Sequence, residues 1–155
     1  MQIEIKEAYN HLDTVRELFG EYVSSLNIDL AFQSYEEELA SLPGKYSRPD
    51  GRLYLAYSDG LAAGCIGLRR YDRSRCEMKR LYVRSRFRGM KLGERLADQV
   101  ICDAKAAGYA YMLLDTLPSM KSAQALYRKL GFKEIEPYYG TPIEHTRFLC
   151  LPLKG

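Results

Sequence analysis

The sequence has few of the residues that build metal and redox sites. It contains two isolated histidines and four cysteines with no CxxC spacing. Structural zinc sites use clusters of these residue types, so we expect no metal ion. The cysteines fall in apolar segments, and we expect buried, reduced thiols in a cytoplasmic protein. They are Cys65, Cys76, Cys102 and Cys150.

Long apolar runs, repeats and linkers are also missing. No stretch approaches the roughly 18 apolar residues that a membrane span needs. Residues 1–4 lack the basic flank and apolar core of a signal peptide. With 155 residues and no low-complexity segment, we expect residues 1–155 to form a single domain. The net charge of +3 argues against a protein that coats nucleic acid.

Positive charge is concentrated in one stretch. Between Lys79 and Arg95 there are seven lysines and arginines against a single acid, Glu94. This stretch reads as the end of a strand, a tight turn and the first turn of a helix, and Gly89 and Gly93 let a ligand approach the backbone. The unpaired N–H groups and partial positive charge of a helix N-terminus suit a phosphate. We therefore expect a small polyanion at this turn.

The spacing of apolar residues predicts alternating strands and helices. The predicted strands cover residues 3–5, 53–57, 63–68, 76–83, 111–114, 132–135 and 148–151. The predicted helices cover residues 12–26, 34–42, 92–107 and 123–130. A capping box of Ser34 and Glu37 opens the second helix. Residues 45–51 and 137–142 are predicted to be loops.

Turn signals fix how these elements connect. Asp59-Gly60 predicts a hairpin, so the three strands between residues 53 and 83 should form an antiparallel meander. The following helix leads into a buried strand, which predicts a right-handed parallel crossover. The expected fold class is α/β, a mixed sheet of six or seven strands with about four helices.

Two sequence motifs together resemble one family. The P-loop and the Rossmann GxGxxG patterns are absent. Residues 88–93, RGMKLG, instead resemble the R/Q-x-x-G-x-G/A signature of the GCN5-related N-acetyltransferases (GNAT). Residues 122–132, SAQALYRKLGF, resemble the second motif of that family, A-x-x-L-Y-x-K-x-G-F. The element order also matches from Ile3 to Leu151, so the resemblance is specific.

The resemblance implies a GNAT fold that binds acetyl-CoA as co-substrate. The pyrophosphate would lie on residues 88–94, and the pantetheine arm would pair with the strand at residues 81–83, whose N–H groups could polarise the thioester carbonyl. The implied cofactor-binding residues are Leu81, Tyr82, Val83, Arg88, Gly89, Met90, Lys91, Leu92, Gly93, Glu94, Met120 and Ser122.

Two positions depart from the family pattern. Lys91 stands where glycine is usual, so the turn should be less open, and its ammonium could reach a phosphate. Met120 stands where many members have an asparagine that bonds the pantetheine arm. Ser119 and Ser122 are the candidates to replace that contact.

The implied reaction transfers an acetyl group to a primary amine by direct attack in a ternary complex. An amine of pKa about 10.4 must first lose a proton, which costs roughly 4.6 kcal/mol at pH 7, so a base is needed. Glu77 and Asp115 each match bases of family members, and Glu77 is preferred because it stands in an apolar strand. The alternatives are a salt bridge of Glu77 with Lys79 or an arginine of a neighbouring strand, and a turn stabilised by Asp115. Tyr127 matches the acid that protonates the leaving thiolate.

The acceptor is open among a small metabolite, a peptide N-terminus, a protein lysine and an antibiotic. An aromatic wall with one arginine would suit an amine that also bears a carboxylate; its candidates are Tyr22, Phe32, Tyr35, Tyr138, Tyr139 and Arg69. We expect acetyl-CoA and an amine as partners, neither nucleic acid nor membrane, and leave a homodimer open. Two rival interpretations are a non-catalytic acyl-CoA-binding module and a nucleic-acid binder that uses residues 79–95.

Overall fold

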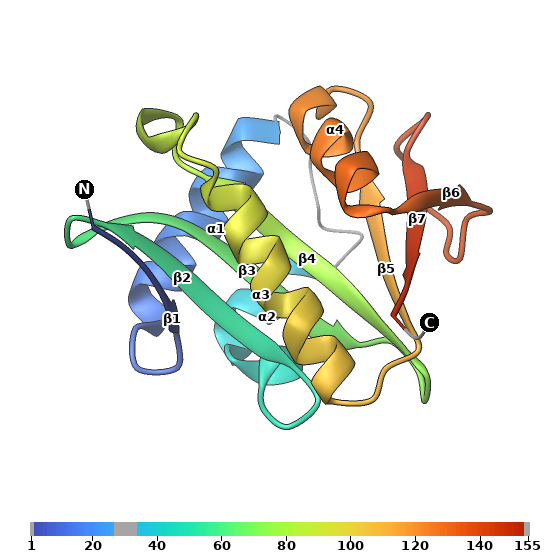
Figure 1. Cartoon of the computed structure of the whole chain (residues 1–155), viewed down its shortest axis with the longest axis horizontal. Coiled ribbons are helices and arrows are strands. Elements are labelled where there is room, and N and C mark those ends of the chain that lie inside the picture. Colours follow the sequence, from blue (N-terminus) through green and yellow to red (C-terminus); the bar gives the residue numbers. More distant parts are fainter. Residues whose placement is uncertain (1, 27–33, 154–155) are drawn as a thin grey trace.

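The computed structural model describes residues 2–26 and 34–153. Within them, seven strands form one mixed sheet in the order β1-β2-β3-β4-β5-β7-β6 (Figure 1). The strands are β1 (Ile3–Glu7), β2 (Arg52–Ser58), β3 (Leu61–Arg70), β4 (Arg75–Val83), β5 (Tyr111–Thr116), β6 (Lys133–Ile135) and β7 (Arg147–Pro152). The α-helices are α1 (Leu12–Leu26), α2 (Tyr35–Ser41), α3 (Leu92–Ala106) and α4 (Lys121–Leu130). Two short 3-10 turns are η2 (Gly44–Tyr46) and η3 (Ser85–Phe87).

This architecture confirms the predicted fold class. Strands β2, β3 and β4 form the antiparallel meander, and β4 and β5 are parallel, joined by α3. Three local predictions were wrong. Ser34 makes no capping bond, because its backbone is left-handed at φ 56°. The predicted loop at residues 45–51 begins inside η2, whose Tyr46 is buried. Cys102 is exposed, because it lies on the outer side of α3.

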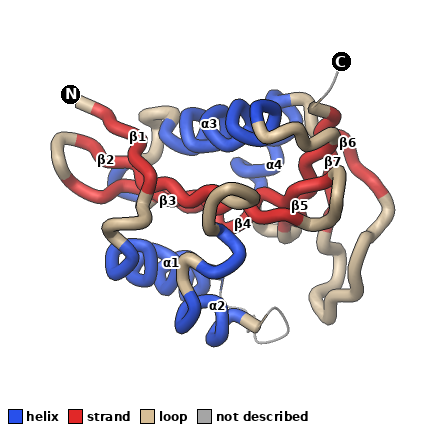
Figure 2. Tube along the Cα trace, turned by 90° about the horizontal axis from the view of Figure 1, so that it is seen from below, coloured by secondary structure: helices blue, strands red, loops and turns tan. Residues whose placement is uncertain are grey.

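The helices cover the two faces of the sheet. Figure 2 shows α3 and α4 on one face and α1 and α2 on the other. Each face has its own apolar core: Leu96 and Val100 of α3 pack on one side, and Leu18 and Phe19 of α1 pack on the other. The loop between β6 and β7 extends to the side of α1 and α2 (Figure 2). In the described parts of the chain, every helix is too short or too polar to cross a membrane.

The sheet opens between its two central strands. Strands β4 and β5 pair over only three positions, ending at Glu77 opposite Leu113. Beyond that point the strands diverge toward the end where α4 lies (Figure 1). A bulge in β4 accompanies the opening, because Arg80 and Leu81 both stand opposite Ile66 of β3 and Arg80 has φ 60°. Bulges bend strands and redirect side chains, and this one lies where the edge of β4 becomes free.

Candidate active site

A tight turn joins β4 to α3 beside this opening. After Val83, the turn η3 buries the ring of Phe87, which fixes the turn on the core. The chain then passes through Gly89 at φ 87° and Lys91 at φ 61°, both in the left-handed region. Gly89 takes this conformation without steric cost, whereas Lys91 takes it against the preference of a residue with a Cβ atom. Helix α3 begins immediately afterwards at Leu92.

The turn presents a row of backbone donors. The first helical bond of α3 runs from the Arg95 N–H to the Lys91 carbonyl, at 3.1 Å. Among the described residues, no acceptor lies within hydrogen-bonding reach of the backbone N–H groups of residues 89–94. A left-handed residue followed by a helix N-terminus points successive N–H groups at one place, and the helix dipole adds partial positive charge there. We call the unbonded backbone N–H groups of residues 89–94 the nest; this kind of geometry suits an anion.

Side chains around the nest leave it accessible. Lys91 and Arg88 are exposed, and the Arg88 Nε donates to the Val83 carbonyl at 3.3 Å. Glu94 is turned toward α4, where its carboxylate lies 2.8 Å from the Lys129 ammonium. A Cβ atom on Gly93 would meet only ordinary contacts, the nearest at 3.7 Å. The predicted basic turn is present, and its one acid is neutralised.

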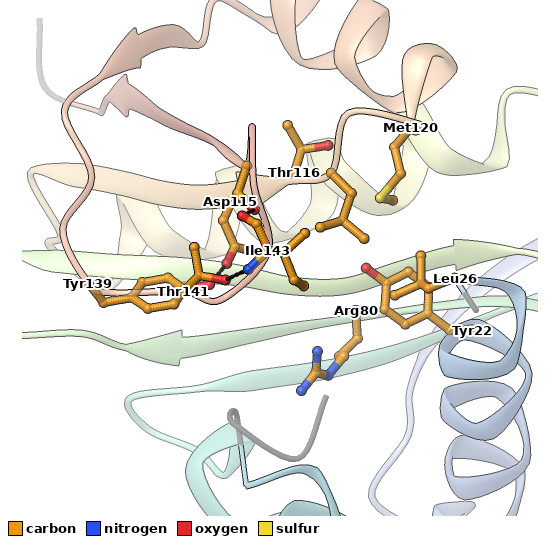
Figure 3. Close-up of a pocket in the computed structure, with 11 residues that line it drawn as sticks. Tyr22, Leu26, Arg80, Asp115, Thr116, Met120, Tyr139, Thr141 and Ile143 are labelled. Atoms are coloured by element: carbon orange, nitrogen blue, oxygen red, sulfur yellow. Dashed lines mark hydrogen bonds between the residues drawn. The ribbon is translucent and has the colours of Figure 1, made fainter. Parts of the chain in front are cut away.

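A narrow pocket lies where β4 and β5 separate. We call it the splay pocket (Figure 3). Its walls come from α1, β4, β5, the segment before α4 and the β6–β7 loop: Tyr22, Leu26, Arg80, Asp115, Thr116, Leu117, Met120, Tyr139, Thr141, Ile143 and Thr146. Its volume of about 20 Å³ leaves room for little beyond a single small group. Both Met120 and Asp115, predicted from the sequence, contribute to these walls.

A larger and more polar cavity adjoins the splay pocket through Arg80 and Tyr139. We call it the charged chamber; it has a volume of about 280 Å³. Its lining residues are Ser34, Glu38, Lys45, Arg69, Tyr71, Glu77, Lys79, Arg80, Tyr138 and Tyr139. The Arg80 guanidinium, which is 3% exposed, donates to both oxygens of Glu38, at 3.0 and 3.2 Å. The ring of Tyr35 lies under the same guanidinium. Burial lowers the pKa of the Lys79 ammonium on the chamber wall.

The two candidate bases have different surroundings. Glu77 is 1% exposed, and its Oε1 accepts from Arg69 of β3 at 2.8 Å. The neighbouring-strand salt bridge considered from the sequence is therefore present. Asp115 is half-buried and lies inside β5, paired with Phe148 of β7. The alternative that Asp115 stabilises a turn was wrong, because β5 continues through Thr116.

Consecutive tyrosines of the β6–β7 loop hold the two carboxylates. The Tyr138 hydroxyl donates to Oε2 of Glu77 at 2.5 Å, and the Tyr139 hydroxyl donates to the carboxylate of Asp115. Both rings pack edge-on against Phe148. These contacts were missed from the sequence, which gave both tyrosines only as parts of an aromatic wall. The signal was a tyrosine pair in a short stiff loop.

Tyr127 of α4 packs in the core beneath α3, close enough to Tyr22 and Asp115 for them to affect its pKa. Its ring is 5% exposed and packs edge-on against Phe132, with centroids 5.7 Å apart. Burial raises the pKa of its hydroxyl, and the nearby Tyr22 hydroxyl and Asp115 carboxylate raise it further. Tyr127 thus keeps its proton throughout the physiological range. Among the described residues, nothing accepts a hydrogen bond from this hydroxyl.

The other predicted residues are distributed as follows. Leu81 and Val83 of β4 pack against the core beneath α3, and the Tyr82 hydroxyl donates to Glu21 of α1 at 3.1 Å. Ser122 is exposed in the first turn of α4, and Ser119 is exposed just before it. Phe32 lies outside the described residues.

Comparison with known proteins decides the family. The model of the "Acetyltransferase (GNAT) family" matches residues 12–132. The chain belongs to the GNAT acetyltransferase family. An uncharacterized N-acetyltransferase of Dictyostelium discoideum is 38% identical, covering 99% of this chain and 100% of the relative. This GNAT protein is an acetyl-CoA-dependent acetyltransferase.

Solved GNAT structures share the fold. A GNAT-family acetyltransferase of Staphylococcus aureus superposes with a TM-score of 0.81 at 28% identity, covering 99% of this chain and 100% of the other. An N-acetyltransferase of Thermoplasma acidophilum, solved in complex with coenzyme A, superposes with a TM-score of 0.75 at 20% identity, covering 98% of this chain and 99% of the other. Both likenesses extend over nearly the whole chain.

Proposed function

We propose that this GNAT protein transfers an acetyl group from acetyl-CoA to a primary amine by direct attack in a ternary complex. The observation that carries the proposal is the nest at residues 89–94, placed beside the opening between β4 and β5. With its pyrophosphate on the nest, acetyl-CoA could extend its pantetheine arm into the opening between β4 and β5. The donor and the acceptor would then approach from opposite faces of the sheet.

The donor would be held mainly by backbone groups. The N–H groups of residues 89–94 suit the two phosphates, with Arg88 and Lys91 adding positive charge. The free edge of β4 at residues 81–83 can pair with the amides of the pantetheine arm as an added strand would. An N–H group on this edge, aimed at the thioester carbonyl, would stabilise the negative charge that develops on its oxygen. Leu81 and Val83 serve the core with their side chains and the donor with their backbone.

The surroundings of the two carboxylates favour Asp115 as the base. Glu77 is 1% exposed and both of its oxygens already accept hydrogen bonds, Oε1 from Arg69 and Oε2 from Tyr138. Asp115 is less buried, and Tyr139 donates to one of its two oxygens. Asp115 faces the splay pocket, where the acceptor nitrogen must meet the thioester. Its carboxylate, directly or through water, would take one proton from the ammonium before attack. Glu77 would then position Arg69 and the β6–β7 loop.

Tyr127 would complete the reaction as the general acid. Attack by the neutral amine forms the C–N bond, and breaking the C–S bond releases the CoA sulfur as a thiolate that needs a proton. The nitrogen loses its second proton to solvent as the amide forms. The Tyr127 hydroxyl is protonated at neutral pH and can supply that proton, although its raised pKa makes it a weaker acid than a free tyrosine. Replacement by phenylalanine, Tyr127→Phe, should lower kcat by less than roughly 10²–10³-fold, because a thiol of pKa about 8.5 already leaves fairly well.

The test measures kcat and the Kd for CoA in the same preparation. Tyr127→Phe should keep the Kd, because it removes a single hydroxyl on the core side of α4. An unchanged kcat would refute the acid role. Initial rates with both substrates varied should give intersecting reciprocal plots; parallel plots would refute the ternary complex in favour of an acetyl-enzyme.

The charged chamber suits an acceptor that carries an anionic group besides its amine. Its described walls hold four cationic side chains, Lys45, Arg69, Lys79 and Arg80, against the two acids Glu38 and Glu77. The sequence suggested that Arg69 binds the carboxylate of the acceptor, but Arg69 already forms an ion pair with Glu77. We therefore assign the acceptor carboxylate to Lys45, the exposed lysine of the chamber wall. Lys45→Met should raise KM for an α-carboxylated amine and spare its decarboxylated analogue, with Lys133→Met as control. Equal changes in both KM values would contradict the assignment.

A further inference from the structure

One polar group in the splay pocket has no hydrogen-bond partner among the described residues. The Thr116 hydroxyl oxygen is buried, and no described residue donates to it or accepts from it. The residue is 2% exposed. A buried hydroxyl without a partner is destabilising, and such groups in folded proteins usually mark a missing ligand, water or ion.

The position of Thr116 restricts which ligands could reach its hydroxyl. It is the last residue of β5, three positions past the end of the pairing with β4. Met112 and Leu114 of β5 pack into the core beneath α3. Side chains alternate along a strand, so Thr116 faces the α3 and α4 side, and Asp115 faces the acceptor side. Figure 3 shows the Thr116 hydroxyl on the side of the pocket where Met120 lies.

The neighbours of Thr116 on this wall supply no strong hydrogen-bonding side chain. Met120 begins α4 and offers only a thioether, which is a weak acceptor. Leu117 is apolar and buried. A threonine hydroxyl both donates and accepts, so it can bond either the carbonyl or the N–H of an amide. The missing partner therefore fits a single amide group that reaches the splay pocket, whose volume of about 20 Å³ admits little more.

We propose that the Thr116 hydroxyl is a donor-binding group that hydrogen-bonds an amide of the pantetheine arm. The inference rests on the proposed function, in which acetyl-CoA occupies this opening. In this protein, Thr116 of β5 would then make the hydrogen bond to the pantetheine arm, because Met120, which precedes α4, has no side chain that can make it. The protein keeps a destabilising hydroxyl in its apo state and uses it when the donor binds.

The test compares binding and stability in one set of variants. Thr116→Val keeps the shape and removes the hydroxyl, and Thr116→Ser keeps the hydroxyl. Calorimetry measures Kd for CoA and for adenosine 3′,5′-bisphosphate, which has no pantetheine arm. Thr116→Val should weaken CoA binding by about 3- to 10-fold, the value of one hydrogen bond, and leave bisphosphate binding unchanged. It should also raise the Tm of the ligand-free protein, and Thr116→Ser should restore CoA affinity.

Three results would overturn the inference. An unchanged CoA affinity with a raised Tm would mean that the hydroxyl serves no ligand, or only water. A lowered Tm with unchanged affinity would mean that the hydroxyl is bonded within the protein. Equal weakening of CoA and the bisphosphate would mean a general distortion of the nest. Failure of the unaltered protein to bind CoA at all would instead refute the proposed function, so the two failures are distinguishable.

Discussion

The donor side and the acceptor side of the site are built from different chemistry. The donor side offers backbone N–H groups of six consecutive residues, 89–94, without protein acceptors among the described residues. The acceptor side offers side chains that are already paired, Arg69 with Glu77 and Arg80 with Glu38. Backbone donors recognise an anion whatever the neighbouring side chains are, whereas paired side chains fix one arrangement of charge. In the proposed function, donor recognition is therefore local in the chain, and acceptor recognition is assembled from α2, β3, β4, β5 and the β6–β7 loop.

The largest expected effect separates the two carboxylates of the acceptor side. Asp115→Asn should lower kcat by roughly 10²–10⁴-fold, the range for loss of a general base, with Kd for CoA unchanged. Glu77→Gln should lower kcat by less than about tenfold, since we assign Glu77 a positioning role. It should also lower the free energy of unfolding by more than about 1 kcal/mol, because it removes the charge that partners Arg69.

Steady-state rates over pH 6–10 and denaturant unfolding measure both variants. The rate of Asp115→Asn should rise more steeply with pH than that of the unaltered protein, because only amine that is already neutral can then attack. If Glu77→Gln showed the larger kcat loss without a stability loss, the base would be Glu77, as the sequence alone favoured.

An intermediate effect tests the donor side through Lys91. Lys91→Glu should raise KM for acetyl-CoA roughly tenfold, because it places an anion beside the pyrophosphate, and should leave kcat at saturation unchanged. The fold should tolerate it, since acids are favourable at a helix N-terminus. Lys133→Glu, on the exposed strand β6, is the matched charge control.

Lys91→Gly separates charge from backbone strain. Glycine relieves the left-handed conformation, worth up to about 1 kcal/mol of stability, and should raise KM by only about two- to threefold. An unchanged KM in Lys91→Glu would show that the pyrophosphate does not lie on this turn.

Local signals in the sequence predicted the turn after β4 and the start of α3 well. The glycines and cations at residues 88–93 are contiguous, so one turn and one helix start could be read directly. The acceptor side could not be read this way, because Tyr138 meets Glu77 across 61 residues and Tyr139 meets Asp115 across 24. Such contacts depend on how a loop packs, which residue spacing does not encode. Ser34 shows the limit of local signals, since α2 begins just after it but its left-handed backbone prevents the predicted capping bond.

The smallest effect concerns the link between α1 and the end of β4. Hydrogen bonds from Arg84 hold the pKa of the Glu21 carboxyl below its ordinary value. A lowered folded-state pKa stabilises the fold above the unfolded-state pKa, near 4.3, and this contribution is lost as the pH falls through the folded-state value. Arg84→Met should cost less than about 1 kcal/mol at pH 7, since the pair is partly exposed. The difference from the unaltered protein should shrink below pH 4 in urea unfolding; a difference independent of pH would show that the ion pair is not its cause.

The central claim is that acetyl-CoA on the nest delivers its acetyl group through the opening to an amine on the far side. Thiol release from acetyl-CoA, measured over a broad panel of amines, tests it most directly. We predict release that depends on the amine, is strongest for acceptors bearing a carboxylate, and falls in Asp115→Asn. Tight CoA binding with no amine-dependent thiol release across the panel would contradict it.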